Sequence, residues 1–324
     1  MPNAIVVHEI GGPEQLRYET VEDRAPGPGE ARIRQTAIGL NFVDVYVRTG
    51  LYKPPSLPFV PGQEGAGIVE AVGPDVTEVR VGERVAYAGL SGAYAEVRVA
   101  PAARLVPLPD GIDDRTAAAM ILKGITAEFL LRRCARLERG DAILVHVAAG
   151  GVGTIACQLG RVMGLRVIGT AGGPDKVARA RANGCDEVID YTREDVVARV
   201  KALTGGVGVR AVFDSVGKAT FAASLDSLAP RGLLALFGQS SGVVPPFDPS
   251  MLAARGSLFL TRPSFWHYVA TRAELLASAQ VLFGAVSHGD VRIEIGQTFP
   301  LRDAAEAHRA LESRRTTGST LLLP

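Results

Sequence analysis

The chain has 324 residues, of which 47% are hydrophobic and 21% are charged, with a formal net charge of +1. This length predicts about two domains, each large enough to bury its own core, and the near-zero charge gives no electrostatic reason to expect DNA, RNA or an anionic membrane as the main partner. The start of the chain lacks the pattern of a signal peptide, and no apolar run approaches the roughly 20 residues that span a bilayer, so we expect a cytoplasmic protein with no membrane partner.

The first 120 or so residues contain short alternating apolar runs separated by turn-rich pieces. The runs are AIVVHEI (4–10), EARIRQTAIGL (30–40), GAGIVEAVG (65–73) and ERVAYAGL (83–90). Alternation of this kind, interrupted by Gly, Pro and Asp, is typical of strands with one buried face. This part of the chain therefore predicts a compact, mostly antiparallel β domain.

From about residue 140 to residue 261, apolar runs without polar alternation are separated by stretches with helical spacing. The apolar runs are AILVHVA (142–148), RVIGTA (166–171), EVIDY (187–191), AVFDSVG (211–217), GLLALFG (232–238) and SLFLTRP (257–263). The expected helices lie at 153–164, 175–184, 194–206 and 219–232. Strands buried on both faces and alternating with helices predict an α/β fold with a doubly wound parallel sheet.

The tail carries a predicted helix (270–286), a strand (293–301), a second helix (304–315) and a final strand (319–324). We expect it to fold back onto the first domain, because strands at the two ends of a chain often complete one sheet.

The segment AAGGVG (148–153) lies between a predicted strand and a predicted helix, in an A-x-G-x-x-G version of the dinucleotide fingerprint. Gly150 and Gly151 permit a tight turn and a close approach of the backbone to a pyrophosphate. Gly153 lets the helix pack on the strand, and the helix N-terminus faces the negative charge. The segment predicts a dinucleotide-binding site.

The tip of the next strand bears on the choice of dinucleotide. Residues 170–173 (Thr, Ala, Gly, Gly) contain no acid that could accept from a ribose 2′-hydroxyl, and Asp175 is expected to cap the next helix. Lys176 is placed to meet a 2′-phosphate, and the hydroxyl of Tyr191 could bind the same group. NADPH is therefore favoured over NADH, although Lys176 could instead be a solvated helix charge.

The sequence offers few ligands for a metal. Catalytic zinc takes three protein ligands and structural zinc usually four. Gln63 is a poor ligand, Glu64 alone cannot hold the ion, and the segment 85–105 has no cysteine. The histidines and cysteines are scattered over separate elements: His8, His146, His267, His288, His308, Cys134, Cys157 and Cys185. We predict no metal site and no disulfide framework, and we expect His146, Cys157 and Cys185 to be core residues.

Several motifs together resemble one family. They are IGLNFVDVYVRTGLY (38–52), PGQEGAGIVEAVG (61–73), LKGITA (122–127), AAGGVG (148–153), FDSVG (213–217), FGQSSG (237–242), LTRPS (260–264) and ESRRTTG (312–318). The chain is similar to zinc-lacking members of the medium-chain dehydrogenase/reductase superfamily, specifically the NADPH:quinone oxidoreductases that include zeta-crystallin. In metal-using relatives a cysteine ligand would lie near Asn41 and a histidine at Gln63.

The resemblance implies a GroES-like catalytic domain (1–123 and 262–324), a Rossmann NADPH-binding domain (124–261) and a cofactor cleft between them. The implied cofactor contacts are Phe42, Asp44, Tyr46, Gly150, Gly151, Val152, Gly153, Gly172, Gly173, Lys176, Tyr191, Ser215, Phe237, Ser240, Ser241 and Arg314. The implied polar rim of the substrate pocket, which supplies the catalytic candidates, is Asn41, Tyr46, Tyr52 and Thr126. Phe129 occupies a place where an aromatic residue with a hydroxyl is expected.

A quinone is a good hydride acceptor because reduction makes its ring aromatic, so it requires orientation and a few hydrogen-bond donors rather than a Lewis acid. Asn41, Tyr46 and Tyr52 are the candidate donors, although they could instead satisfy loop backbone or pack the cleft wall. We expect Asp44 to orient a loop or a ribose hydroxyl rather than to act as a general base.

The leading hypothesis is NADPH-dependent quinone reduction. The alternatives are reduction of α,β-unsaturated ketones or aldehydes, and an RNA-binding or structural crystallin-type role. The strand SLFLTRP could pair with its copy in a homodimer, as the resemblance implies.

Overall fold

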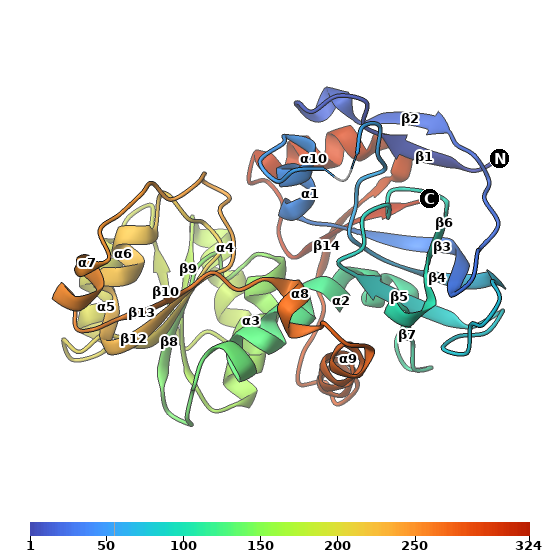
Figure 1. The fold of residues 1–324 in the computed structure, drawn as a ribbon. Coiled ribbons are helices and arrows are strands. Elements are labelled where there is room, and N and C mark those ends of the chain that lie inside the picture. Colours follow the sequence, from blue (N-terminus) through green and yellow to red (C-terminus); the bar gives the residue numbers. More distant parts are fainter. Residues whose placement is uncertain (55) are drawn as a thin grey trace. The chain divides into compact units, whose positions relative to one another are not determined.

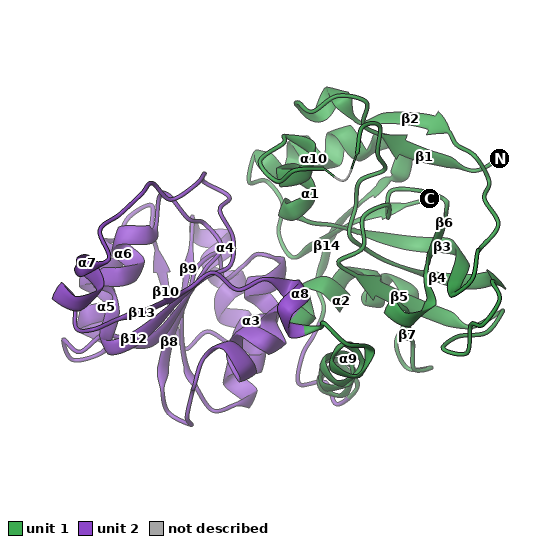
Figure 2. Ribbon diagram, viewed as in Figure 1, with its two compact units in different colours: residues 1–125, 269–287, 293–324 green, residues 126–268, 288–292 purple. Residues whose placement is uncertain are grey.

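A computed structural model describes residues 1–54 and 56–324 of the chain, which divide into two compact units. Unit 1 comprises residues 1–125, 269–287 and 293–324, and unit 2 comprises residues 126–268 and 288–292 (Figure 2). The C-terminal residues therefore return to the unit that the N-terminal residues form, as the tail predicts.

Unit 1 is built mainly from strands (Figure 1). Its elements are β1 (Asn3–Val6), β2 (Arg17–Thr20), β3 (Glu30–Leu40), α1 (Phe42–Arg48), β4 (Glu64–Val72), β5 (Arg84–Ala88), β6 (Val97–Pro101), β7 (Val106–Pro107), α2 (Asp114–Phe129, shared with unit 2 from residue 126), α9 (Arg272–Ser287), β14 (Ile295–Pro300), α10 (Ala304–Glu312) and β15 (Ser319–Leu323), with short 3-10 helices at Pro13–Gln15, Ala102–Arg104 and Leu301–Asp303.

The larger sheet of unit 1 has the order β14-β15-β3-β4-β5-β7, and β6 also pairs with β3. All neighbours are antiparallel except β14 and β15, which are parallel. The last strand lies against the long β3 with Thr320 opposite Leu40, so the C-terminus completes the sheet begun near the N-terminus. Its core is formed by buried side chains such as Ile33, Ile38 and Leu322.

Unit 2 alternates strands and helices. After a π-helical segment at Leu130–Cys134 come β8 (Ala142–Val145), α3 (Gly151–Val162), β9 (Arg166–Ala171), α4 (Pro174–Ala182), β10 (Glu187–Asp190), α5 (Val196–Leu203), β11 (Val209–Asp214), α6 (Phe221–Asp226), β12 (Leu228–Leu236), α7 (Ser250–Ala254), β13 (Phe259–Thr261) and α8 (Phe265–Tyr268).

The six strands of unit 2 form one parallel sheet in the order β10-β9-β8-β11-β12-β13. The chain builds outward from β8 in one direction and then from β11 in the other. The strand order therefore reverses between β8 and β11, and in open parallel sheets ligands bind beyond the carboxyl ends of the strands at such a point. The predicted mixed α/β fold class, a doubly wound sheet together with a GroES-like domain, is confirmed.

Two local expectations for unit 2 need correction. The helix expected at 219–232 ends at Asp226, and β12 already begins at Leu228. Pro230 could not donate a helical hydrogen bond, and a helix would exclude the positive φ of 61° at Arg231. Asp175 does not cap α4, because Gly173 is the N-cap and Asp175 lies within the first turn.

The division between the units falls close to the expected domain boundaries at 123/124 and 261/262, which stay predictions. Residues 262–268 cluster with unit 2. The side chain of Arg262 donates to the carbonyl of Leu236 at 2.7 Å, and Arg133 donates to the carbonyl of Tyr268 at 2.7 Å. Across the described residues, no helix combines the length and apolar character that crossing a bilayer requires.

Candidate active site

The loop after β8 forms a backbone cradle at the switch point of unit 2. Helix α3 begins at Gly151, and its N-cap residue is Gly150, which has no side chain to cap the first turn. A Cβ on Gly153 would lie 2.2 Å from the carbonyl oxygen of Val147, so only glycine permits this close packing of helix and loop. Free N–H groups at the start of a helix bind anions, and the fit of this loop to a pyrophosphate is therefore good.

Val147 adopts a left-handed conformation, with φ of 56°, at the start of this loop. A β-branched residue pays a steric cost in that region, and such strain is concentrated at ligand-binding sites. Val147 is held by its neighbours: the amide of His146 donates to Phe213 at 3.0 Å, and that of Ala148 donates to Thr170 at 2.9 Å.

His146 is buried, as predicted for a core residue, but it is also hydrogen-bonded. Its Nδ1 lies 3.1 Å from Thr170 Oγ1, and its Nε2 lies 3.0 Å from Ser224 Oγ. Ser224 in turn donates to Asp214 at 2.7 Å. Burial lowers the pKa of His146 against the opposing effect of Asp214, so the ring is neutral at physiological pH.

The tip of β9 lies close to the hydroxyl of Tyr191 and to the carboxylate of Asp190. A Cβ on Gly172 would lie 2.5 Å from the hydroxyl oxygen of Tyr191, which places these two predicted contacts side by side. Gly173, with φ of 86°, donates its amide to Asp190 Oδ1 at 3.1 Å. That carboxylate also accepts from Thr192, and these hydrogen bonds hold the pKa of Asp190 below its usual range. Lys176 is half-buried on the first turns of α4.

The turns after β11 and β12 are joined to each other by hydrogen bonds. The amide of Ser240 donates to Ser215 at 3.2 Å, and the hydroxyl of Ser241 donates to Val216 at 2.7 Å. Phe237 donates its amide to the carbonyl of Asp214 at 2.8 Å. The predicted contacts Ser215, Phe237, Ser240 and Ser241 therefore lie together at the carboxyl edge of the sheet.

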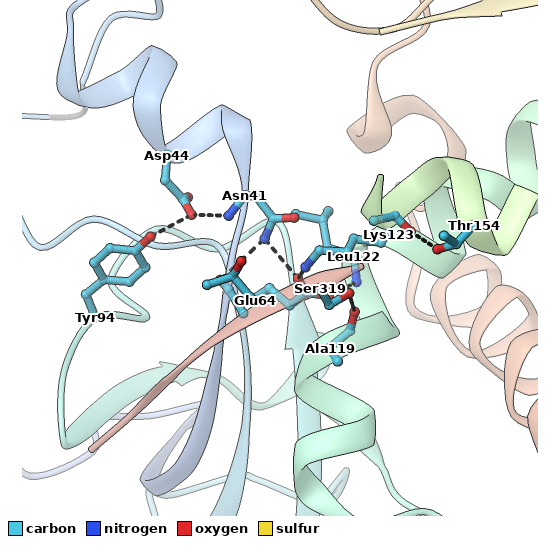
Figure 3. A network of polar contacts seen from close by, with 12 residues as sticks. Asn41, Asp44, Glu64, Tyr94, Ala119, Leu122, Lys123, Thr154 and Ser319 are labelled. Carbon is cyan, nitrogen blue, oxygen red and sulfur yellow. Dashed lines mark hydrogen bonds and ion pairs between the residues drawn. The ribbon is translucent and has the colours of Figure 1, made fainter. Parts of the chain in front are cut away.

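In unit 1, Asn41 and Asp44 form a capping box at the N-terminus of α1. Asp44 Oδ2 accepts from the amide of Asn41 at 2.9 Å and from the hydroxyl of Tyr94 at 3.0 Å (Figure 3). Burial raises the pKa of Asp44 to about 7, against the opposing effects of these two donors and of Lys123. The carboxyl group thus orients a loop, and it titrates near neutral pH.

The side chain of Asn41 joins a second buried group (Figure 3). Its Nδ2 donates to Glu64 Oε2 at 2.9 Å, and Glu64 also accepts from the amide of Leu122 at 2.7 Å and forms an ion pair with Lys123. A Cβ on Gly39, which pairs with Glu64 across β3 and β4, would lie 2.4 Å from Glu64 Oε2. Glycine at that position makes room for the carboxylate.

The aromatic candidates on and after α1 contact one another. The ring centroids of Tyr46 and Tyr52 are 5.1 Å apart, and those of Phe42 and Tyr46 are 6.0 Å apart. In unit 2, Thr126 is half-buried in the last turn of α2, and Phe129 stacks on Tyr268 with centroids 4.2 Å apart.

Two further predictions concern the C-terminal segment and the metal. Arg314 follows α10 and is exposed, with φ of 59°. In the part of the chain that the structure describes, no three His, Cys, Asp or Glu side chains gather as a metal site would require. The oxygens of Glu64 already accept hydrogen bonds from the side chain of Asn41 and the amide of Leu122, and they form an ion pair with Lys123.

Comparisons with known proteins cover the whole chain. Residues 27–110 match the alcohol dehydrogenase GroES-like domain, and residues 151–274 match the zinc-binding dehydrogenase domain. A quinone oxidoreductase of Pseudomonas aeruginosa is 52% identical, with 100% of both chains covered. The chain belongs to the quinone oxidoreductase family.

Solved structures of this family agree with the assignment. An Escherichia coli quinone oxidoreductase complexed with NADPH is 44% identical with a TM-score of 0.98, and the match covers 99% of this chain and 100% of that one. A mycobacterial protein complexed with NADPH is 47% identical with a TM-score of 0.96, and both chains are covered completely. The family predicted from the motifs is therefore confirmed.

The sequence analysis did not predict the side chains that hold the candidate site residues in place. Lys123 lies within a quoted motif, but its pairing with Glu64 has no sequence signal, because the two residues lie on different elements. Tyr94 and His308 are 214 residues apart in sequence and are hydrogen-bonded. Cys157 and Cys185, buried as expected, lie with their sulfur atoms 3.3 Å apart.

Proposed function

We propose that this protein is an NADPH-dependent quinone reductase. The observation that carries the proposal is similarity to quinone oxidoreductases over the full chain, with the A-x-G-x-x-G cradle placed at the switch point of the parallel sheet. A bound NADPH supplies the hydride, and the residues of the chain bind and orient the two reactants.

The preference for the phosphorylated cofactor rests on the β9 tip. A phosphate at the ribose 2′ position requires cations and hydroxyls, whereas a free 2′-hydroxyl is usually bound by an acid. At that tip the hydroxyl of Tyr191 lies beside Gly172, and Lys176 provides a charge. The nearby carboxylate of Asp190 already accepts at its Oδ1 from Gly173 and Thr192. We assign the 2′-phosphate to Lys176 and Tyr191.

The remaining proposed contacts follow the same division. The pyrophosphate is assigned to Gly150, Gly151, Val152 and Gly153. The turns after β11 and β12 contribute Ser215, Phe237, Ser240 and Ser241, and the tip of β9 contributes Gly172 and Gly173. The nicotinamide side is assigned to Phe42, Asp44 and Tyr46, with Arg314 as a further contact. The substrate carbonyl is assigned to the polar groups Asn41, Tyr46, Tyr52 and Thr126.

Hydride transfer to a quinone leaves an oxyanion that hydrogen-bond donors stabilise. The hydroxyls of Tyr46 and Tyr52 and the side-chain amide of Asn41 are the candidate donors. The Nδ2 of Asn41 also donates to Glu64 and to the carbonyl of Gly39. Through these two hydrogen bonds, Asn41 also holds Glu64 and the end of β3 beside the start of α1.

The test is steady-state consumption of NADPH and of NADH with 1,4-benzoquinone. We expect turnover with NADPH and a clearly higher KM for NADH. The proposal falls if benzoquinone consumes neither cofactor while a reference quinone reductase is active in the same buffer.

Reduction of an activated carbon–carbon double bond is the second candidate. A 2-haloacrylate reductase of Burkholderia is 44% identical, with 100% of this chain and 99% of that protein covered. A conjugated acid and a quinone both accept hydride at a carbon conjugated with a carbonyl. Parallel assays with an enone and with 2-chloroacrylate separate this reaction from quinone reduction. An RNA-binding assay at physiological salt tests the third hypothesis, an RNA-binding role.

We also propose a homodimer and a cytoplasmic location. β13 is the last strand in the order of its sheet, and Phe259 on it is 61% exposed, which leaves an edge for pairing with a second copy. Light scattering of the wild-type protein and of Phe259→Glu tests the dimer.

A further inference from the structure

A line of buried hydrogen bonds runs from Arg48 to Asp44 within unit 1. Arg48 Nη1 lies 2.8 Å from His308 Nδ1, His308 Nε2 lies 3.1 Å from the hydroxyl oxygen of Tyr94, and that hydroxyl lies 3.0 Å from Asp44 Oδ2. All four side chains are buried. They come from α1, from the loop between β5 and β6, and from α10.

The donors in this line point in one direction. A guanidinium can only donate, so Nδ1 of His308 must accept and the proton of the neutral ring lies on Nε2. Burial and Arg48 lower the pKa of His308 to about 3, which keeps the ring neutral. Nε2–H therefore donates to Tyr94, and the hydroxyl of Tyr94 is left to donate to Asp44.

Arg48 is itself fixed in place. Its Nη2 forms an ion pair with Glu312 at 2.7 Å, and its Nε donates to the carbonyl of Gly11 at 3.1 Å. The start of the line is therefore anchored by a charge, and its direction cannot reverse without moving that charge.

Asp44 depends on this line because its other oxygen has no support. Among residues 1–54 and 56–324, nothing forms a hydrogen bond to the buried Oδ1. Both donors to the carboxylate, Asn41 N–H and Tyr94 O–H, act on Oδ2. Loss of one donor from a buried carboxylate favours its protonated form.

We propose that Tyr94 and His308 are positioning residues of the proposed NADPH site: they keep Asp44 a hydrogen-bond acceptor, and so hold the start of α1, with Phe42 and Tyr46, in place. This inference rests on the proposed function. When Asp44 is protonated, its Oδ2 accepts these two hydrogen bonds without a negative charge and therefore more weakly, so the capping box at Asn41 loosens and NADPH binding weakens.

The charged and titratable groups around Asp44 come from several elements. Tyr94, His308 and Arg48 form the line described above. Lys123 lowers the pKa of Asp44, and Glu64 raises it. The charges of Asp44 and Glu64 both raise the pKa of Tyr87. Among these groups, Tyr94 is the one whose hydroxyl donates directly to Asp44, so removing this hydroxyl isolates the effect of the line on the protonation of Asp44.

The test is the dissociation constant for NADPH, measured by fluorescence from about pH 5.5 to 9, for the wild type and Tyr94→Phe. We expect wild-type binding to weaken below about pH 7, and the variant to begin weakening about one pH unit higher. At about pH 9 the two dissociation constants should agree within about twofold, because Asp44 is ionised in both proteins.

Tyr87→Phe is the matched control. The Tyr87 hydroxyl is as deeply buried as that of Tyr94, but it donates to Gln35. This variant should leave the pH profile unchanged. His308→Leu should shift the pH profile in the same direction as Tyr94→Phe. His308→Gln can still accept from Arg48 and donate to Tyr94, so this variant should keep the wild-type profile. Asp44→Asn should bind weakly, and its only remaining pH dependence in this range should be that of the 2′-phosphate of NADPH, which titrates near about pH 6.

The outcomes separate the two claims. A wild type that binds no NADPH at any pH overturns the proposed function, while infrared titration of the Asp44 carboxyl in the free Tyr94→Phe protein still tests the line. A wild type that binds NADPH, with an unshifted profile in a folded Tyr94→Phe, overturns the positioning role alone.

Discussion

Lys123 in α2 forms an ion pair with Glu64 at the start of β4, and the two side chains are 6% and 0% exposed. A buried pair of this kind owes its stability to complete hydrogen bonding, and Glu64 has it, with Asn41 and Leu122 as its other donors. The pair joins the helix that follows the β domain to the strand that faces Gly39.

Lys123→Met should therefore lower the free energy of unfolding by about 3 to 5 kcal/mol, because it leaves the Glu64 charge buried without its partner. Chemical denaturation measures the loss. Arg309→Met is the control: its ion pair with Glu306 is 47% and 61% exposed, and such pairs contribute less than about 1 kcal/mol. Equal losses in the two variants would contradict this reading of the buried pair.

Gly153→Ala should weaken NADPH binding by on the order of tenfold, or about 1.4 kcal/mol, because the added Cβ would displace Val147 and with it the cradle. Gly284→Ala is the control, since a Cβ there meets nothing within 4 Å. Isothermal titration measures both affinities. Unchanged binding by a folded Gly153→Ala would show that close packing of loop and helix is not needed.

Lys176→Ala should raise the KM for NADPH by about tenfold to a hundredfold and leave the KM for NADH nearly unchanged, because a charge-assisted contact contributes about 1.5 to 3 kcal/mol. Steady-state assays with both cofactors give the ratio. Arg199→Ala, on the surface of α5, controls for the loss of a positive charge. An equal rise for both cofactors would show that Lys176 does not read the 2′-phosphate.

Sequence periodicity predicted the strands of unit 2 well, because most of their side chains lie in an apolar core. It misjudged 227–232, where helical spacing continues through Pro230 although β12 has begun. The glycine loop was predictable because glycine leaves a mark in the sequence wherever backbone must come close, as at Gly153.

The polar supports were not predictable. Tyr94 and His308 meet only because β15 returns the tail to the first sheet, and nothing in their neighbouring residues records that contact. The raised pKa of Asp44 follows from its burial, which the residues around it do not record, and the hydrogen bond that opposes this shift comes from Tyr94, a distant residue in the sequence.

Two buried groups of this line should affect stability in opposite directions as the pH changes. The pKa of His308 falls from 6.5 to about 3 on folding, so its contribution is complete above pH 6.5 and is lost as the pH falls toward 3. The pKa of Asp44 rises from 3.8 to about 7, so its contribution is complete below pH 3.8 and is lost as the pH rises through 7. Each slope is at most about 1.4 kcal/mol per pH unit.

Between about pH 4 and 6.5 the two slopes oppose each other, and single variants should separate them. Relative to the wild type, Asp44→Asn removes the falling contribution, so its free energy of unfolding should rise more steeply with pH, by about 1 kcal/mol per unit. His308→Gln removes the rising contribution and should tilt the curve the other way by a similar amount. Urea denaturation at several pH values measures the slopes, with Tyr87→Phe as the reference for a buried substitution outside the line. Parallel curves for all four proteins would mean that neither group changes its protonation on folding.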